Sequence, residues 1–315
     1  MAVDHARSLA FGPLGVPPRR RLAPRLARLL FWMLSAVLAV LAVVTVHLVR
    51  AAIVESLEEQ AIEPKAAGTA TPLQFGVAFH DIRLRVADRV VHGRFVQAAR
   101  PGAPAVLIFH GNGETVSDWS NVQARLFDGG VASLVFDYSG FGNSSGKPTV
   151  DHMRADAQAA YASLVRLTPG AEGRVLIGHS LGNAVMLDAA GSLRPVPSGI
   201  VIHAAFTSAR EMAIQSGMVS AVVAKFLPDL WDNEAALVAG GPPLLVLHGE
   251  QDDVIPPAMG RKLAQVAVGR RAEFKILAGI GHDDFYTKPS NQEWGPIFRF
   301  VASVSGSRQL EDVRR

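Results

Sequence analysis

The stretch Arg174-Val-Leu-Ile-Gly-His-Ser180-Leu-Gly-Asn-Ala-Val-Met-Leu-Asp-Ala-Ala190 decides the fold of this chain. Residues 174–177 have the pattern of a short buried strand, and residues 183–190 have that of a helix. Between them, residues 178–182 read Gly-His-Ser-Leu-Gly, a Gly-x-Ser-x-Gly sequence. A strand that turns sharply into a helix at such a sequence exposes the serine hydroxyl at the edge of a sheet. This setting predicts that Ser180 is a nucleophile.

A second Gly-x-Ser-x-Gly sequence occurs at residues 142–146, with Ser144 at its centre. This match lies in a polar, glycine-rich loop and is followed by Lys147-Pro148. No strand runs directly into it and no helix follows directly, so it is typical of a turn. Of the two serines, we therefore expect Ser180 to be the nucleophile.

From about Leu73 onward, short apolar runs alternate with longer helical patterns. We expect strands at 82–86, 90–96, 105–109, 133–136, 174–177, 199–203, 244–247 and 273–277, and helices at 117–127, 150–167, 183–190, 257–266 and 292–304. The first two strands are close enough for an antiparallel hairpin. The later alternation predicts a doubly wound α/β fold, with a mostly parallel sheet and helices on both faces. The segment between His203 and Leu244, about 40 residues, is long enough for a small cap.

A serine nucleophile needs a base, and the base needs an orienting acid. Three histidines follow the turn at Ser180, namely His203, His248 and His282. His203 and His248 end strands, and neither has a plausible acid at a strand end between itself and Ser180. His282 follows the last expected strand in a glycine-rich loop and is therefore the predicted base.

The acid is expected in the loop after the preceding strand, because the carboxyl ends of parallel strands meet at one edge of the sheet. That loop offers Glu250, Asp252 and Asp253. These acids could instead cap the helix that begins near Pro257, so the residues alone leave the acid open.

The loop His110-Gly-Asn112-Gly113 follows the expected strand 105–109. A backbone N–H group from this loop, predicted to be that of Asn112, can bind a developing oxyanion together with the N–H group of Leu181.

The N-terminal part contains an uncharged stretch of 21 residues, Leu29 to Val49. A helix of that length spans about 30 Å, which is the thickness of the hydrocarbon core of a bilayer. Basic residues lie upstream, at Arg19, Arg20, Arg21, Arg25 and Arg28, whereas downstream come Arg50 and then Glu55, Glu58 and Glu59. The positive-inside rule then predicts a cytoplasmic N-terminus and an extracytoplasmic remainder. A cleaved signal peptide is one alternative, although its apolar region is usually shorter. A buried core helix is the other, although such a helix is rarely apolar on every side.

These patterns divide the chain into a basic segment 1–28, a membrane anchor 29–49, a stalk 50–72, a catalytic domain 73–305 and a tail 306–315. A net charge of +3, with arginines gathered near the N-terminus, argues against nucleic-acid binding. The chain has no cysteine, which excludes disulfides and Cys-based zinc sites. We expect no cofactor and no metal.

Residues 73–304 resemble the α/β-hydrolase superfamily, in particular the single-span hydrolases with a Phe-His-Gly-Asn loop, which include eukaryotic protein depalmitoylases. The matching stretches are 109–112, 137–142, 145–148, 178–182, 248–256 and 281–283. The resemblance implies the fold and a Ser-His-Asp triad, with Asp252 as the acid because the family pattern has it four residues after His248. Ser139 replaces the family's arginine. The second asparagine that is common after His-Gly-Asn is missing, because the chain continues with Gly113-Glu114-Thr115. Both departures are expected near the acyl or leaving-group site. The cysteine-rich N-terminus of the depalmitoylases is absent.

The resemblance implies hydrolysis of a carboxylic ester or thioester through an acyl-enzyme, with acyl substrates that include lipid-derived ones. Three alternatives stay open: a peptidase on the same triad, acyl transfer to an alcohol, and a non-hydrolytic, partner-binding member of the fold. The stretch 218–227 is expected to line an acyl pocket, touch lipid or belong to the core.

Overall fold

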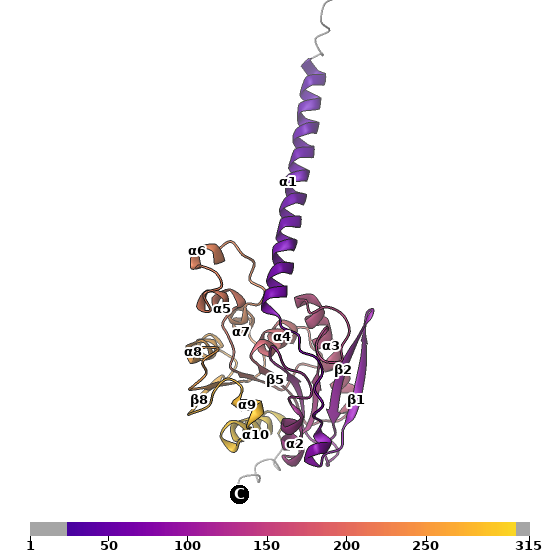
Figure 1. The fold of residues 1–315 in the computed structure, drawn as a ribbon, viewed down its shortest axis with the longest axis vertical. Helices are drawn as coiled ribbons and strands as arrows, with labels where there is room; N and C mark the ends of the chain where they lie inside the picture. Colours follow the sequence, from indigo (N-terminus) through magenta and orange to yellow (C-terminus); the bar gives the residue numbers. More distant parts are fainter. Residues whose placement is uncertain (1–23, 307–315) are drawn as a thin grey trace, which may run out of the picture. The chain divides into compact units, whose positions relative to one another are not determined.

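A single mixed sheet organises the part of the chain that the computed structural model describes, residues 24–306 (Figure 1). The strand order is β1-β2-β4-β3-β5-β6-β7-β8. The strands are β1 His80–Val86, β2 Arg89–Val96, β3 Ala105–Phe109, β4 Ala132–Phe136, β5 Arg174–His179, β6 Gly199–His203, β7 Leu244–Gly249 and β8 Glu273–Leu277. β2 pairs antiparallel with β1 and β4, and all later pairs are parallel. The predicted strands, hairpin and mostly parallel sheet are confirmed.

The helices of the domain follow the strand alternation. They are η1 Pro72–Phe75 (a 3-10 helix), α2 Ser120–Asp128, α3 Val150–Leu167, α4 Leu181–Ala190, α5 Ala209–Gln215, α6 Ala221–Ala224, α7 Asn233–Val238, α8 Pro257–Val266, α9 Asp284–Thr287 and α10 Asn291–Ser305. The five predicted helices are all present. The unpredicted η1, α5, α6, α7 and α9 have four to seven residues, which is too short for a periodic apolar pattern to be read.

The two faces of the sheet carry separate hydrophobic cores. Leu107 and Phe109 of β3 pack with residues of α3, α4, α7 and α8, whereas Val106 and Ile108 pack with residues of α2 and α10. Successive side chains of a strand point to opposite faces, so a sheet covered on both faces needs apolar residues at every position. This explains why β3 reads as an uninterrupted apolar run, and it confirms the doubly wound architecture.

The helix α1, Pro24–Ala61, carries the apolar stretch. Its part from Leu26 to Ala61 is a candidate membrane span by length and composition, with a hydropathy of 2.7. The predicted span 29–49 lies inside it. The described residues up to Ala51 form one compact unit, and Ala52 begins the second unit, which includes the whole sheet.

The segment predicted as a stalk, residues 50–72, starts as a continuation of α1. It is not exposed throughout, because Glu58 and Ile62 are buried in the second unit. Most of the expected N-terminal segment 1–28 and of the C-terminal tail 306–315 lies outside the described residues.

Candidate active site

Ser180 occupies the sharp turn between β5 and α4. Its backbone has φ 50° and ψ −122°, a conformation that residues with a side chain rarely adopt. Holding a residue in such a backbone conformation costs about 1–3 kcal/mol of folding free energy, and the conformation persists only where its surroundings enforce it. Here the Ser180 N–H donates to the carbonyl of His203 at 3.1 Å, and the Asn183 side chain donates to the Ser180 carbonyl at 3.0 Å. These bonds tie the turn to β6 and to the first turn of α4.

The glycines on either side of Ser180 are required by close approach. A Cβ atom at Gly182 would lie 2.1 Å from the carbonyl oxygen of Phe109, and one at Gly178 would lie 2.6 Å from Oδ1 of Asn183. Real Cβ atoms do not approach other atoms so closely. The Gly-x-Ser-x-Gly spacing therefore allows α4 to begin directly against the end of β3.

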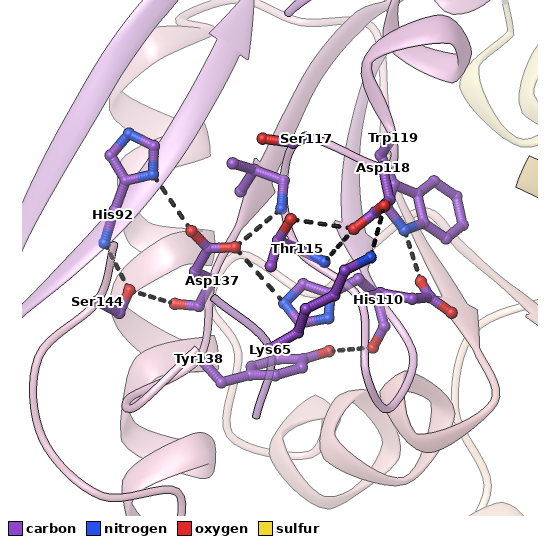
Figure 2. A network of polar contacts seen from close by, with 12 residues as sticks. Lys65, His92, His110, Thr115, Ser117, Asp118, Trp119, Asp137, Tyr138 and Ser144 are labelled. Carbon is purple, nitrogen blue, oxygen red and sulfur yellow. Dashed lines mark hydrogen bonds and ion pairs between the residues drawn. The ribbon is translucent and has the colours of Figure 1, made fainter. Parts of the chain in front are cut away.

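Ser144, in the second Gly-x-Ser-x-Gly sequence, has its hydroxyl committed to the backbone. It donates to the carbonyl of Asp137 at 2.7 Å and accepts from the N–H group of His92 at 2.8 Å (Figure 2). The Asp137 carboxylate in turn accepts from the N–H of Val116 at 2.8 Å. Burial raises the pKa of Asp137, but hydrogen bonding from His92 and the nearby His110 outweigh it and lower the pKa. These hydrogen bonds stabilise the loop, which agrees with the prediction that Ser144 lies in a turn.

Asp252 and His282 meet at the carboxyl ends of β7 and β8. Nδ1 of His282 lies 2.9 Å from Oδ2 of Asp252 and 3.0 Å from its Oδ1. Oδ1 also accepts from the N–H of Ile255 at 2.8 Å. Burial raises the pKa of Asp252, but hydrogen bonds from His248 and His282 outweigh burial and hold the pKa far below its usual range. An ionised carboxylate that binds Nδ1–H leaves the imidazole with Nε2 as its free basic atom.

The competing acids of the same loop do not contact His282 among the described hydrogen bonds and ion pairs. Asp253 is exposed. Glu250 accepts from the N–H of Gly279 at 3.1 Å and so holds the loop that precedes His282. Nε2 of His248, at the end of β7, lies 3.3 Å from Oδ2 of Asp252 and 2.8 Å from the carbonyl oxygen of Ile255.

Two backbone N–H groups near Ser180 remain without a protein acceptor. Among the hydrogen bonds of the described residues, neither the N–H of Asn112 nor that of Leu181 donates to another group. Both residues line the same cavity as Ser180. Unpaired donors at the start of a helix and in an adjoining loop are the arrangement that stabilises an oxyanion.

The side chain of Asn112 has a role that sequence reasoning missed. Its Oδ1 accepts from the N–H of Glu63 at 2.8 Å, and its Nδ2 donates to the carbonyl of Ala61 at 3.0 Å. Gly113 adds a backbone bond to the carbonyl of Glu63 at 3.1 Å. The loop after β3 is thus fastened to the end of α1 and to the residues that follow it.

Glu114 is a second residue whose role was missed. It is almost fully buried and accepts from the N–H of Gly111 at 2.8 Å and from Nε1 of Trp119 at 2.7 Å. Its other oxygen lies 3.3 Å from Nε2 of His179, the neighbour of Ser180. Burial raises the pKa of Glu114 to about 8. Burial also drives the pKa of His179 well below its ordinary value, so the pair is favoured in its uncharged form.

Ser139, the other departure from the family pattern, does not line the cavity of Ser180. Its Oγ accepts from Nε of Arg89 at 2.9 Å, and its N–H donates to Asp156 at 2.8 Å. Arg89 and Asp156 also form an ion pair at 3.4 Å. Ser139 thus lies in the buried interior beside the ion pair between Arg89 of β2 and Asp156. The expectation that this substitution lies at the substrate site is therefore wrong.

One group of side chains within the described residues has the spacing of metal ligands. Ligand atoms of His179, His282 and Asp283 lie within 4.8 Å of one another. Because Nδ1 of His282 faces Asp252, a metal would have to take Nε2 of this histidine. That is the atom a triad would use for proton transfer, so metal binding and triad chemistry would exclude each other.

The Ser180 cavity has a volume of about 270 Å³. Phe206, Met212, Trp231 and Ile255 contribute apolar walls. The cap stretch 218–227 divides between two roles. Met218, Val219, Ala224 and Leu227 line this cavity or an adjoining one, whereas Val222, Val223 and Phe226 line neither; these three and Met218 are exposed.

Comparison with known proteins agrees with this architecture. Residues 101–241 match the family model described as serine aminopeptidase, S33. An uncharacterized protein of Mycobacterium tuberculosis is 30% identical over 197 residues, which cover 60% of this chain and 66% of that protein. The lysophosphatidylserine lipase ABHD12 of Xenopus tropicalis is 29% identical over 202 residues, covering 58% of this chain and 52% of the lipase. The matches therefore span about half to two thirds of these relatives.

Among solved structures, an esterase of Pyrococcus furiosus superposes with a TM-score of 0.62 at 17% identity, over 77% of this chain and 96% of the esterase. At that identity the likeness concerns the fold. The sheet order, the sharp turn at Ser180 and these matches agree on one superfamily.

Proposed function

Because the chain belongs to the α/β-hydrolase superfamily and is of its serine hydrolase type, we propose that it cleaves a carboxylic ester or thioester with Ser180, His282 and Asp252. The observation that carries the proposal is the contact between Nδ1 of His282 and the ionised Asp252 at 2.9 Å. This contact supports a role of the His282 imidazole as the base that acts on Ser180, which lies in the strained turn at the same edge of the sheet.

The reaction is an acyl transfer in two steps. His282 accepts the proton of the Ser180 hydroxyl as Oγ bonds to the carbonyl carbon of the substrate. The N–H groups of Asn112 and Leu181 bind the oxyanion. The bond to the leaving alcohol or thiol then breaks, and His282 returns the proton to the leaving atom. In the second step His282 accepts a proton from water as the water oxygen bonds to the carbonyl carbon of the acyl-enzyme. His282 then returns the proton to Oγ of Ser180 as the acid is released.

Labelling with a fluorophosphonate probe tests the nucleophile. The full chain in detergent should be labelled, and the Ser180→Ala variant should not. Ser144→Ala serves as the matched control and should be labelled like the wild type. Labelling of Ser180→Ala at the wild-type rate would overturn the assignment, and a wild type that resists the probe would favour a non-hydrolytic member of the fold.

A peptidase on the same triad is the second candidate, because the matching family model carries an aminopeptidase description. A panel of ester, thioester and amide substrates with one common acyl group distinguishes the two. We expect ester and thioester turnover to exceed amide turnover, whereas faster amide cleavage would favour the peptidase. Product analysis with an added alcohol detects acyl transfer to an acceptor other than water.

We further propose that α1 anchors the protein in a membrane with the hydrolase domain on the extracytoplasmic side. Arginines gather on the N-terminal side of the apolar stretch, and only Arg50 follows it directly, which is the asymmetry that the positive-inside rule associates with this orientation. A reporter fused after Arg315 tests the orientation. Reporter activity confined to the cytoplasm would reverse it.

A further inference from the structure

The end of α1 and the residues after it form part of the wall of the Ser180 cavity. Gln60, Ala61 and Glu63 line this cavity together with Ser180 and Leu181. These residues belong to the same compact unit as the sheet, because that unit begins at Ala52. The residues that follow the candidate span therefore contribute directly to the site.

This wall is held in position by buried contacts. Ile62 is 3% exposed and belongs to the core on one face of the sheet. The carboxylate of Glu58, itself 8% exposed, accepts from the N–H of Val150 at the start of α3, at 2.8 Å. Further along, Lys65 forms an ion pair with Asp118 at 2.9 Å (Figure 2). Together with the two bonds from the Asn112 side chain, these contacts make the segment 58–65 a fixed part of the domain.

A second cavity, of about 110 Å³, adjoins the first along the same wall. The two share Gln60 and Ala61 of α1, Ala209 and Ala213 of α5, and Met218 of the cap. Leu57, one turn before Ala61, lines the second cavity and not the first. The cavities therefore follow one another, beginning at Ser180 and continuing along the last turns of α1.

The second cavity is lined mainly by aliphatic side chains, among them Leu57, Val219, Leu227 and Leu230. Its one charged residue, Arg210, has two of its three guanidinium nitrogens directed at protein groups, while its Nε is buried without a partner among the described residues. The guanidinium donates to the carbonyl of Leu227 at 3.0 Å and lies 3.8 Å from the carboxylate of Asp229. A polar ligand would lose its hydration there and find few partners, whereas an alkyl chain gains about 0.8 kcal/mol for each buried CH₂ group.

We propose that the two cavities together bind the acyl chain of the substrate, with Leu57 of α1 at the far end, so that the anchor helix itself helps to select acyl length. The substrate class is an ester or thioester of an unbranched acyl chain that extends beyond the first cavity. This inference rests on the proposed hydrolysis at Ser180. It makes Leu57 a specificity-determining residue that does not touch the reacting atoms.

Acyl-length profiles of the full chain in detergent test the proposal, with 4-nitrophenyl acetate and dodecanoate as substrates. The Leu57→Trp variant should lower kcat/KM for dodecanoate at least about tenfold, because several CH₂ groups lose their site. Its kcat/KM for acetate should stay within about twofold of the wild type, because acetate does not reach the second cavity. Glu59→Trp is the matched control: Glu59 is exposed and lines neither cavity, so both substrates should be unaffected.

An unchanged dodecanoate rate in Leu57→Trp would overturn the proposal, and so would an equal loss on both substrates in a folded variant. If Leu57→Trp does not fold, Leu57→Ala decides: it should move the preference toward longer chains at an unchanged acetate rate, and an unmoved profile would overturn the proposal. Failure of the proposed function looks different, because the wild type would then hydrolyse neither ester faster than Ser180→Ala. A dodecanoyl thioester in solution and monododecanoylglycerol in mixed micelles, compared in the same variants, distinguish a soluble from a membrane-borne acyl donor.

Discussion

One carboxylate oxygen of Glu114 accepts the N–H of Gly111 at 2.8 Å, which joins a buried acid to the loop that carries Asn112. The other oxygen faces Nε2 of His179 at 3.3 Å. The acid therefore contacts both the oxyanion loop and the residue before the nucleophile. Because burial raises the pKa of Glu114 to about 8, its protonation state should change near that pH.

The first prediction concerns stability and pH. The unfolded chain releases the proton of Glu114 near the ordinary value of 4.5, whereas the folded protein keeps it up to about 8. The folded state then binds more protons between these values, so the free energy of unfolding falls as pH rises through this window and levels off above it. The expected fall is on the order of 2–4 kcal/mol. Denaturant unfolding of the full chain in detergent from pH 4.5 to 9 measures it.

Glu114→Gln mimics the protonated acid and should remove most of this slope. The amide oxygen still accepts from Gly111 and Trp119, and the amide N–H group can donate to His179. Glu59→Gln, at an exposed position, should keep the wild-type slope. A Glu114→Gln variant with the slope of the wild type would show that another group is responsible.

The second prediction concerns the glycine after the nucleophile. Gly182→Ala would bring a Cβ atom to 2.1 Å from the Phe109 carbonyl oxygen, and neither backbone can move without separating α4 from β3. We expect a loss of about 3 kcal/mol or more in unfolding free energy, together with reduced activity. Gly191→Ala, at the end of the same helix, meets nothing within 4 Å. Its unfolding free energy should stay within about 1 kcal/mol of the wild type.

The third prediction concerns the strain at Ser180. Glycine adopts a positive φ without penalty, whereas alanine retains the steric conflict of serine. Ser180→Gly should therefore be more stable than Ser180→Ala by about 0.5–1 kcal/mol, even after the greater flexibility of glycine in the unfolded chain is subtracted. Thermal unfolding of the two inactive variants measures the difference. Equal stability would mean that the turn is not strained.

The fourth prediction separates two neighbouring acids. Asp252→Asn removes the charge that binds Nδ1–H of His282 and should lower kcat by about 10⁴. Asp253→Asn, one residue later and exposed, should stay within about twofold of the wild type. Ester hydrolysis at saturating substrate measures both. Comparable losses in the two variants would count against Asp252 as the orienting acid.

The sequence by itself determined the order and type of the main elements. Strands buried on both faces, such as β3 and β5, read as continuous apolar runs, and the glycines around Ser180 mark a turn that no other residue could form as closely. Local patterns of this kind need no knowledge of distant contacts. They were sufficient to predict the sheet, the turn at Ser180 and the candidate base.

Only the tertiary structure decided how distant segments meet. Asn112 binds Glu63 and Ala61 across about 50 positions of the chain, and Asp252 rather than Asp253 turns inward because the loop after β7 packs against the loop after β8. Burial and pairing depend on which segments become neighbours, and loops of mixed polarity carry no periodic signal of that. For the same reason the sequence did not indicate that residues after the apolar stretch would line the cavity of Ser180.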